Sequence, residues 1–442
     1  MSTNTRKVAV DIINEVLYKN AYSNLALNLQ LKRYNFDERD RALITEIIYG
    51  TIKHKYTIDR ILSSFLREGI ESIDKFVLTL LRISIYQFKY LSKVPDFAIV
   101  NEAVEICKGY STIKNSKIVN GVLRNFLRKG EPKFKFKNEE EKLAYEFSYP
   151  TWMVKLFLKQ YGKENALKIL KGLNERPSIT VRVNPLMGDY EEVFEAMEKE
   201  GYEVSECDIC PEGINIKRGS SIELNKLFKE GYITVQDESA MIVATLMELS
   251  DRLTVLDTCS APGGKTTHIA ELMNNNGEIL ACDIHEHKLK LIRDNASRLN
   301  IDIIKPEIRN AEEFYSEFEE KFHRVLVDAP CSGLGIIRKK PEIKWNKSEK
   351  DLKNLHSIQY KILNNSVRYV KKGGSLIYST CTLNKDENEK VIKELLNDNP
   401  EFKVDKIYLG KVENIIYHEE GYITILPNEN MDGFFMCKIK RQ

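Results

Sequence analysis

Two cysteines occupy comparable places in two apolar segments of the sequence. VLVDAPCSG at 325–333 carries Asp328 and Cys331, and LIYSTCT at 376–382 carries Cys381. Both segments are predicted strands that run into a polar turn, so these side chains should gather at the carboxyl edge of one sheet, where open α/β sheets bind ligands. A single cysteine at a sheet end is usually a small buried apolar residue. Two cysteines with a carboxylate indicate thiolate chemistry.

Such a group suits methylation at carbon 5 of a pyrimidine, which is a weak nucleophile. Addition of a thiolate at carbon 6 would push electron density onto carbon 5, which could then attack an electrophilic methyl group. A proton acceptor and an acid or hydrogen-bond donor complete the scheme. The site should lower the pKa of the attacking thiol from its usual value of about 8.5. Lys265 and Arg338 are the candidate sources of the positive field.

A third motif, LDTCSAPGGKTTHIA at 253–267, resembles the end of a nucleotide-triphosphate loop. A Walker loop needs a glycine five positions before its Gly-Lys-Thr, and that position holds Cys259, which excludes it. The loop instead follows a predicted strand and opens a helix, whose free N–H groups can face a ligand. The next strand, EILACD, ends in Asp283, placed to bind the hydroxyls of an adenosine ribose. The absence of GxGxxG argues against NAD, while a tight turn with a surface aspartate remains the alternative.

Three segments must position these motifs. Residues 1–137 are predicted to form a helical bundle, because apolar residues recur with a helical period, with breaks at Asn35–Asp37, Gly69 and Gly109 and a linker at 131–141. The first such stretch places on one helical face Val8, Ile12, Ile13, Val16 and Leu17.

Residues 138–235 are predicted to form a small α+β domain. Its helices are expected around 152–161, 163–174 and 190–200, and its strands at SITVRVN, YEVSE, GINIK and YITVQD. Residues 236–442 alternate short apolar strands with helical stretches, which predicts a parallel sheet with crossover helices. YITILP and GFFMCKIK close the chain as an antiparallel hairpin, giving a seven-stranded, mostly parallel, Rossmann-like sheet of the methyltransferase type.

Composition and charge narrow the class of protein. With 42% hydrophobic and 30% charged residues, and no apolar run of the roughly 18 residues that cross a membrane, the chain is expected to be a cytoplasmic globular protein, with nothing demanding more than a monomer. Its eight cysteines are too dispersed for a disulfide framework. No metal site is expected; Cys207 and Cys210 form a lone CxxC, interpreted as two thiols in a loop, with metal or redox use as the weaker alternative.

Charge is unevenly distributed along the chain. The net charge is +2, yet residues 1–137 hold 24 lysines and arginines against 14 aspartates and glutamates. A basic N-terminal third indicates a nucleic-acid partner, although a basic solvated surface has the same composition.

The motifs together resemble the bacterial ribosomal RNA cytosine-5 methyltransferases of the NOL/NOP/Sun group. The resemblance rests on LDTCSAPGGKTTHIA, DAPCSGLGIIRKKPEIKW, YSTCTLNKDENEKVI and the terminal DGFF. ERDRALITEIIYGTIKHKYTIDRIL, AIVNEAVEICK and KIVNGVLRNFLR resemble the NusB-type RNA-binding domain, and VRVNPL and GYITVQDESA resemble the segments that precede the catalytic domain. The resemblance covers essentially the whole chain. It implies a cytoplasmic enzyme acting on 16S rRNA, free or in a 30S assembly intermediate.

The resemblance also assigns roles to residues. It implies that Cys381 is the nucleophile, that Cys331 assists release of the methylated base, and that Asp328 borders both cytosine and cofactor. The residues alone leave open which cysteine attacks, since DNA cytosine methyltransferases use the Pro-Cys position. The cofactor implied is S-adenosylmethionine, bound by Asp283 and Asp328 and by the loop residues Cys259, Ser260, Ala261, Pro262, Gly263, Gly264 and Lys265.

Two further assignments depart from, or extend, the family pattern. The family usually has an Asp-Ala-Arg-like segment after the third strand; here RNAEE places Asn310 there, which can still exchange hydrogen bonds with adenine. IIRKKPEIKW at 336–345 offers Arg338, Lys339, Lys340 and Trp345 as contacts to RNA phosphates, an exposed charged loop being the alternative.

Two other functions stay open at this point. One is a ribosome-assembly or RNA-binding factor whose catalytic site has decayed, which the intact Cys331, Cys381 and Asp328 disfavour. The other is a methyltransferase for transfer RNA or another ribosomal cytosine, which the NusB-like segment disfavours.

Overall fold

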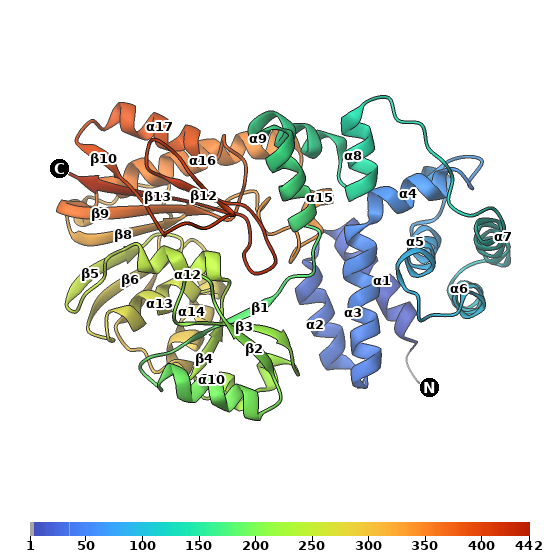
Figure 1. Ribbon diagram of the computed structural model, residues 1–442, viewed down its shortest axis with the longest axis horizontal. Coiled ribbons are helices and arrows are strands. Elements are labelled where there is room, and N and C mark those ends of the chain that lie inside the picture. The colour runs from blue at the N-terminus through green and yellow to red at the C-terminus, as the bar shows by residue number, and fades with distance from the viewer. Residues whose placement is uncertain (1–3, 35) are drawn as a thin grey trace. The chain divides into compact units, whose positions relative to one another are not determined.

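The computed structural model describes residues 4–34 and 36–442, which form two compact units (Figure 1). One unit runs to Ala166 and includes Ile337–Ser348; the other comprises Leu167–Ile336 and Glu349–Gln442. The chain therefore leaves the second unit after Ile336, contributes twelve residues to the first, and returns at Glu349. The division into three domains at 137 and 235 stays a prediction.

The first unit is helical, as the periodicity predicts. Its core is built from apolar faces such as that of Ile12, Ile13 and Val16, all fully buried. The helices are α1 (Thr5–Lys19), α2 (Ser23–Arg33), α3 (Glu38–Lys53), α4 (Lys55–Ser63), α5 (Lys75–Tyr90), α6 (Asp96–Tyr110), α7 (Ile113–Lys129), α8 (Glu139–Phe147) and α15 (Ile343–Asn346).

The helix boundaries differ from prediction in two places. Gly69 lies between α4 and α5 as expected, whereas Gly109 lies inside α6, which continues to Tyr110; a glycine lowers helix propensity but does not by itself end a helix. The predicted linker ends at Asn138, whose side chain accepts a hydrogen bond from the Glu141 N–H and caps α8. Asn35, in the remaining predicted break, lies outside the described residues.

A four-stranded antiparallel sheet forms the smaller part of the second unit, in the order β2-β3-β1-β4. Every predicted strand is found: β1 (Ile179–Val183), β2 (Glu203–Glu206), β3 (Gly213–Arg218) and β4 (Ile233–Val235). The helices are α10 (Tyr190–Lys199), α11 (Lys226–Lys229) and α9 (Thr151–Gly172), which spans the unit boundary and has non-helical backbone at Gly162.

A nine-stranded mixed sheet forms the larger part, in the order β11-β12-β13-β9-β8-β5-β6-β7 with β10 paired to β13. It contains the seven predicted strands: β5 (Leu253–Asp257), β6 (Gly277–Asp283), β7 (Ile304–Ile308), β8 (Phe322–Asp328), β9 (Val370–Thr380), β12 (Ile423–Ile425) and β13 (Phe434–Arg441). Strands β5 to β9 are parallel and β12–β13 is antiparallel, as expected. The short β10 (Phe402–Asp405) and β11 (Ile415–Tyr417) are additional.

Helices cover both faces of this sheet (Figure 1). One face carries α12 (Glu238–Thr245), α13 (Gly264–Leu272) and α14 (Glu286–Arg298), and the other α16 (Glu349–Val367) and α17 (Glu389–Asp398). The parallel strands therefore direct their carboxyl ends, and the motifs that follow them, to one edge. None of the described helices is long and apolar enough to cross a membrane.

Candidate active site at the carboxyl edge of the sheet

The structure brings the two motif cysteines into contact. Cys331 follows β8 and Cys381 follows β9, and their Sγ atoms lie 3.2 Å apart. The hydrogen bond to the Cys381 sulfur, followed by burial, raises the pKa of the Cys331 thiol well above its ordinary value. Either thiol can donate to the other across this contact, so one sulfur can carry a negative charge while the other keeps its proton.

Asp328 lies at the end of β8 with two donors on its carboxylate. Lys265 Nζ donates to Oδ2 at 2.8 Å, and Ser379 Oγ donates to Oδ1 at 2.8 Å. Burial alone would lower the pKa of Lys265, but the Asp328 carboxylate outweighs it and the pKa is raised. Lys265 therefore stays an ammonium group, and the partner carboxylate comes from β8, the strand next to β5, which carries the predicted cofactor loop.

Glu387 links the loops that bear the two cysteines. Its carboxylate accepts hydrogen bonds from the Ser332 N–H at 2.8 Å and Ser332 Oγ at 2.6 Å, directly after Cys331. Ser332 Oγ in turn lies 2.7 Å from Thr382 Oγ1, directly after Cys381. The carboxylate also accepts from the side-chain amides of Gln359 and Asn384, each at 3.0 Å.

No role for Glu387 was predicted from the sequence, although the motif YSTCTLNKDENEKVI contains it. Glu387 is fully buried, and its carboxylate accepts four hydrogen bonds, none of them from a lysine or arginine. A buried carboxylate is more often paired with a cation. The available signal was an acidic residue six positions after Cys381, within the motif YSTCTLNKDENEKVI. Its contacts make it a positioning residue for both cysteine loops.

The terminal DGFF motif packs against the same loop. The Gly335 N–H donates to the Cys381 carbonyl at 2.9 Å, and the Gly433 N–H donates to the Gly335 carbonyl at 2.9 Å. A Cβ at residue 335 would lie 1.9 Å from the Gly433 carbonyl oxygen. The close approach of these backbones requires glycine at 335 and explains why the motif at the chain's end belongs to the site.

The predicted cofactor loop forms the turn between β5 and α13. Ser260 donates to the Cys282 carbonyl through both its N–H and its Oγ, each at 2.9 Å, which ties the loop to β6. Gly263 caps α13 with φ of 103°, a conformation that favours glycine. Cys259 is half-buried, and the peptide between Ala261 and Pro262 is cis.

Two predicted adenosine contacts follow the next two strands. Asp283, at the end of β6, is buried and accepts a hydrogen bond from the His285 N–H at 2.9 Å, with Lys288 Nζ 3.6 Å away. Asn310, beyond β7, uses its side chain within a local turn, donating to Glu313 and accepting from the Glu312 N–H, each at 3.1 Å. Their contacts with adenosine stay predictions.

Asp257, the aspartate of LDTCSAPGGKTTHIA, is buried at the end of β5. Thr266 Oγ1 donates to its Oδ2 at 2.7 Å, while Oδ1 has no hydrogen-bond partner among the described residues. Burial raises the pKa of Asp257 to about 7, helped by the charge of Asp328 and opposed by the Thr266 hydrogen bond. Folding therefore favours the protonated form of this carboxyl.

We expect Asp257→Asn to stabilise the protein increasingly as pH rises from about 4 to about 7. Because the folded pKa lies above the unfolded value, the wild type loses stability across this window, by up to about 1.4 kcal/mol per pH unit, and the amide does not titrate. Urea unfolding at pH 4.5, 6 and 8 would measure the difference. Asp302→Asn, at an exposed position, is the control; a difference independent of pH at residue 257 would contradict the expectation.

The predicted RNA-binding segment at 336–345 is less exposed than its charged composition indicates. Arg338 is 3% exposed, while Lys339 and Lys340 are half-buried. Trp345 packs against the core of the helical unit and donates from Nε1 to the Ile52 carbonyl at 2.7 Å. Little of the Arg338 side chain is therefore accessible to phosphates, and contact of this segment with RNA stays a prediction.

The same segment has further anchors in the helical unit. Glu342, buried, accepts from the Ser23 N–H at 3.0 Å and from Ser23 Oγ at 2.8 Å. Lys344, also buried, donates to the carbonyls of Ser148 and Lys53 at 3.0 and 3.2 Å. The burial of Lys344 could not be predicted from the sequence, because its ammonium group donates to backbone carbonyls that no sequence pattern reveals.

Cys207 and Cys210 also belong to the second unit. Cys210 is buried, and its N–H donates to the Glu238 carboxylate at 3.0 Å. Among residues 4–34 and 36–442, no group of three or more His, Cys, Asp or Glu side chains is arranged to hold a metal ion.

Three family descriptions match the chain in the order that the fold presents. The NusB family matches residues 3–128, a ferredoxin-like domain of RsmF/B-like methyltransferases matches 149–223, and 16S rRNA methyltransferase RsmB/F matches 244–440. A protein of Bacillus subtilis named probable ribosomal RNA small subunit methyltransferase B is 39% identical, over 100% of this chain and 99% of that protein. The chain belongs to this methyltransferase family.

Solved structures agree with the family and with the fold. The crystal structure of PH0851 aligns with a TM-score of 0.85 and 27% identity, covering 100% of both chains. A methyltransferase homologue from Pyrococcus horikoshii aligns with a TM-score of 0.61 and 27% identity, over 70% of this chain and all of that one. The helical NusB-like part, the small domain and the mixed-sheet methyltransferase domain predicted from the sequence are thereby confirmed.

Proposed function

We propose that this member of the family transfers a methyl group from S-adenosylmethionine to carbon 5 of a cytosine in small-subunit ribosomal RNA. The observation that carries the proposal is the contact between the Cys331 and Cys381 sulfurs beside the Asp328–Lys265 pair. Methylation of a nitrogen, or of a ribose hydroxyl, has no use for two thiols at this place. Addition to a pyrimidine ring uses both.

The residues at the carboxyl edge fit the cofactor. The open space above Gly264, the free N–H groups at the start of α13 and the buried Asp283 carboxylate match a ligand with a charged methionine end and a ribose. Asp283 would hold the ribose hydroxyls and the loop 259–265 the methionine part. When bound, S-adenosylmethionine supplies an electrophilic methyl group.

The two cysteines have different roles in the proposed reaction, one in addition to the base and one in its release. Cys381 Sγ adds as the thiolate to carbon 6 of cytosine and makes carbon 5 nucleophilic. After carbon 5 has gained its methyl group, a base removes the proton from carbon 5, and the Cys381–carbon 6 bond breaks to return the thiolate. Cys331, 3.2 Å from the leaving sulfur, is the group that we assign to this release. Asp328 holds Lys265, whose positive charge supports the thiolate.

One helix of the NusB-like part, α7, carries exposed basic side chains, which supports the proposal that the substrate is RNA. On α7, Lys114, Lys117, Arg124 and Arg128 are exposed and follow one another at helical spacing along one face, which we name the α7 basic row. The opposite face, with Val119, Leu123 and Phe126, is buried in the core. No carboxylate among the described residues forms an ion pair with the row, so it is available to RNA phosphates.

We expect Lys117→Gln/Arg124→Gln to weaken RNA binding through its salt-dependent part. Each lost phosphate contact should reduce the slope of log Kd against log salt by about 1, and affinity should fall about tenfold at low salt. Binding to small-subunit rRNA across a salt series would measure both. Lys199→Gln/Lys226→Gln removes two exposed lysines of the second unit and serves as the control; an equal loss in both pairs would remove the special role of α7.

The reaction itself can be tested with purified components. The full chain would be incubated with methyl-labelled S-adenosylmethionine and undermethylated small-subunit rRNA, free or within the assembling 30S particle, with transfer RNA and large-subunit rRNA in parallel. We expect 5-methylcytosine at one position of small-subunit rRNA. Label in another nucleoside would reject the chemistry, and label in transfer RNA alone would reject the substrate.

A further inference from the structure

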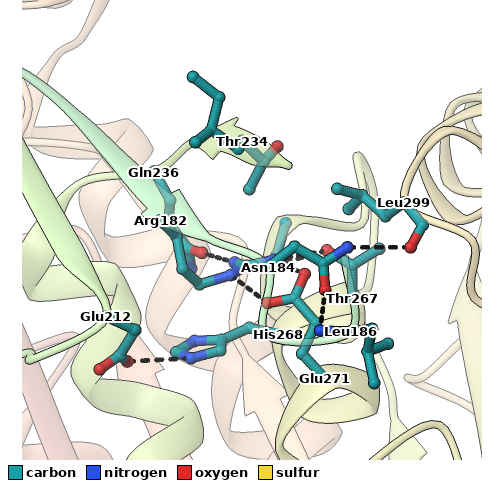
Figure 2. Close-up of polar contacts among 12 residues, drawn as sticks. Arg182, Asn184, Leu186, Glu212, Thr234, Gln236, Thr267, His268, Glu271 and Leu299 are labelled. Carbon is teal, nitrogen blue, oxygen red and sulfur yellow. Dashed lines mark hydrogen bonds and ion pairs between the residues drawn. The ribbon is translucent and has the colours of Figure 1, made fainter. Parts of the chain in front are cut away.

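Arg182 is a fully buried arginine whose five N–H groups all have acceptors. Its Nε and Nη2 donate to the two carboxylate oxygens of Glu271 at 2.7 Å each. Nη1 donates to the Gly264 carbonyl at 3.0 Å and to the side-chain oxygen of Gln236, and Nη2 also donates to Thr267 Oγ1 at 3.2 Å. Figure 2 shows this fork extending from the small sheet to α13.

The alternation of β1 explains why the arginine points there. Val181 and Val183 face the core of the small sheet, so Arg182 and Asn184 face the other way. Asn184 Nδ2 donates to the Leu299 carbonyl at the end of α14, at 3.0 Å (Figure 2). The VRVN motif is thus a strand with an apolar face for its own domain and a polar face for the methyltransferase helices.

The acceptors on α13 lie on one face of that helix. Gly264, Thr267 and Glu271 are three and then four residues apart, which places them in a row along the axis. A rigid planar fork bound at both ends of this row fixes the position of α13 along its axis and its rotation about it. Gly264 is the first residue of α13, and the next residue, Lys265, forms the ion pair with Asp328.

We propose that Arg182 of the small domain is a positioning residue for the S-adenosylmethionine loop at 259–265. It acts through the loop, because it holds the Gly264 carbonyl and the helix start so that the loop is preorganised before the cofactor binds. The inference rests on the proposed function, because the loop's ligand is assigned there. A residue of the small domain would thus contribute to the cofactor site by holding its loop in position.

The test uses the full chain and replaces the buried pair as a unit. Arg182→Met/Glu271→Met keeps the volume apolar, and such replacements of buried ion pairs are often neutral for stability. We expect the Kd for S-adenosylmethionine, measured by calorimetry, to rise about tenfold, the change that loss of one hydrogen bond to a charged donor produces. Hydrogen exchange of residues 258–267 should be faster in the cofactor-free variant than in the wild type.

Two further variants keep the test decisive. Asn184→Ala removes the neighbouring contact on the same strand face without touching α13, and should leave the Kd within about twofold. Arg182→Lys keeps the charge but cannot span Gly264 and Glu271 together, so it should also weaken binding, and it carries the test if the double variant does not fold. Unchanged affinity and exchange in both Arg182 variants would overturn the inference, whereas a wild type that binds no S-adenosylmethionine would reject the proposed function.

Discussion

Cys381→Ala should abolish methylation, and Cys331→Ala should accumulate a covalent protein–RNA adduct. Without the Cys381 thiolate, carbon 5 of cytosine has no activation, so the rate should fall by at least about a thousandfold. Without Cys331, addition and methyl transfer can proceed, but the bond between Cys381 and the base should break slowly. Denaturing electrophoresis with labelled RNA would show the adduct as a band of reduced mobility.

The double variant serves as the control for these roles. Cys331→Ala/Cys381→Ala should form no adduct, and Cys107→Ala, at a buried cysteine of the first unit, should behave like the wild type. An adduct in Cys381→Ala and none in Cys331→Ala would reverse the two assignments.

Glu387→Gln should reduce methylation about a hundredfold and destabilise the second unit by about 2 kcal/mol. The amide would turn an NH2 group toward the Ser332 and Gln359 donors that the carboxylate now accepts from, leaving buried donors unpaired. The loops after Cys331 and Cys381 would lose their common anchor, so the sulfur–sulfur contact would loosen. Steady-state kinetics and urea unfolding would measure the two effects.

A combination of variants separates positioning from simple stability. In the Cys331→Ala background, Glu387→Gln should reduce the amount of adduct at a temperature where both proteins remain folded. Glu401→Gln, an exposed acid just beyond α17, should change neither quantity. Full activity of Glu387→Gln in the folded protein would refute a role for the carboxylate in aligning the cysteines.

The spacing of apolar residues predicted the helices and strands of this fold well, because the burial of each element determines that spacing. Strands such as LTVLD and HRVLVDAP are covered on both faces and read as short apolar runs, while the VRVN strand alternates because its two faces meet different surroundings. The position of the cysteines and of Asp328 followed from one rule, that parallel strands end at one edge. The short β10 and β11 were not predicted.

Contacts between distant segments could not be predicted in the same way. Arg182 and Glu271 are 89 residues apart, and no local pattern links an arginine on one strand to a glutamate on a later helix. The burial of the segment 337–348 could not be predicted for a related reason. Its lysines and arginine indicate a solvated loop by composition, yet Lys344 is satisfied by backbone carbonyls and Trp345 by the helical core.

The most direct test of the central claim is to map 5-methylcytosine in ribosomal RNA from cells with and without this gene. We expect one cytosine of small-subunit rRNA to carry the mark only when the gene is present, and to regain it with the wild-type gene but not with Cys381→Ala. An unchanged set of small-subunit 5-methylcytosines, or loss of the mark from another RNA instead, would contradict the account.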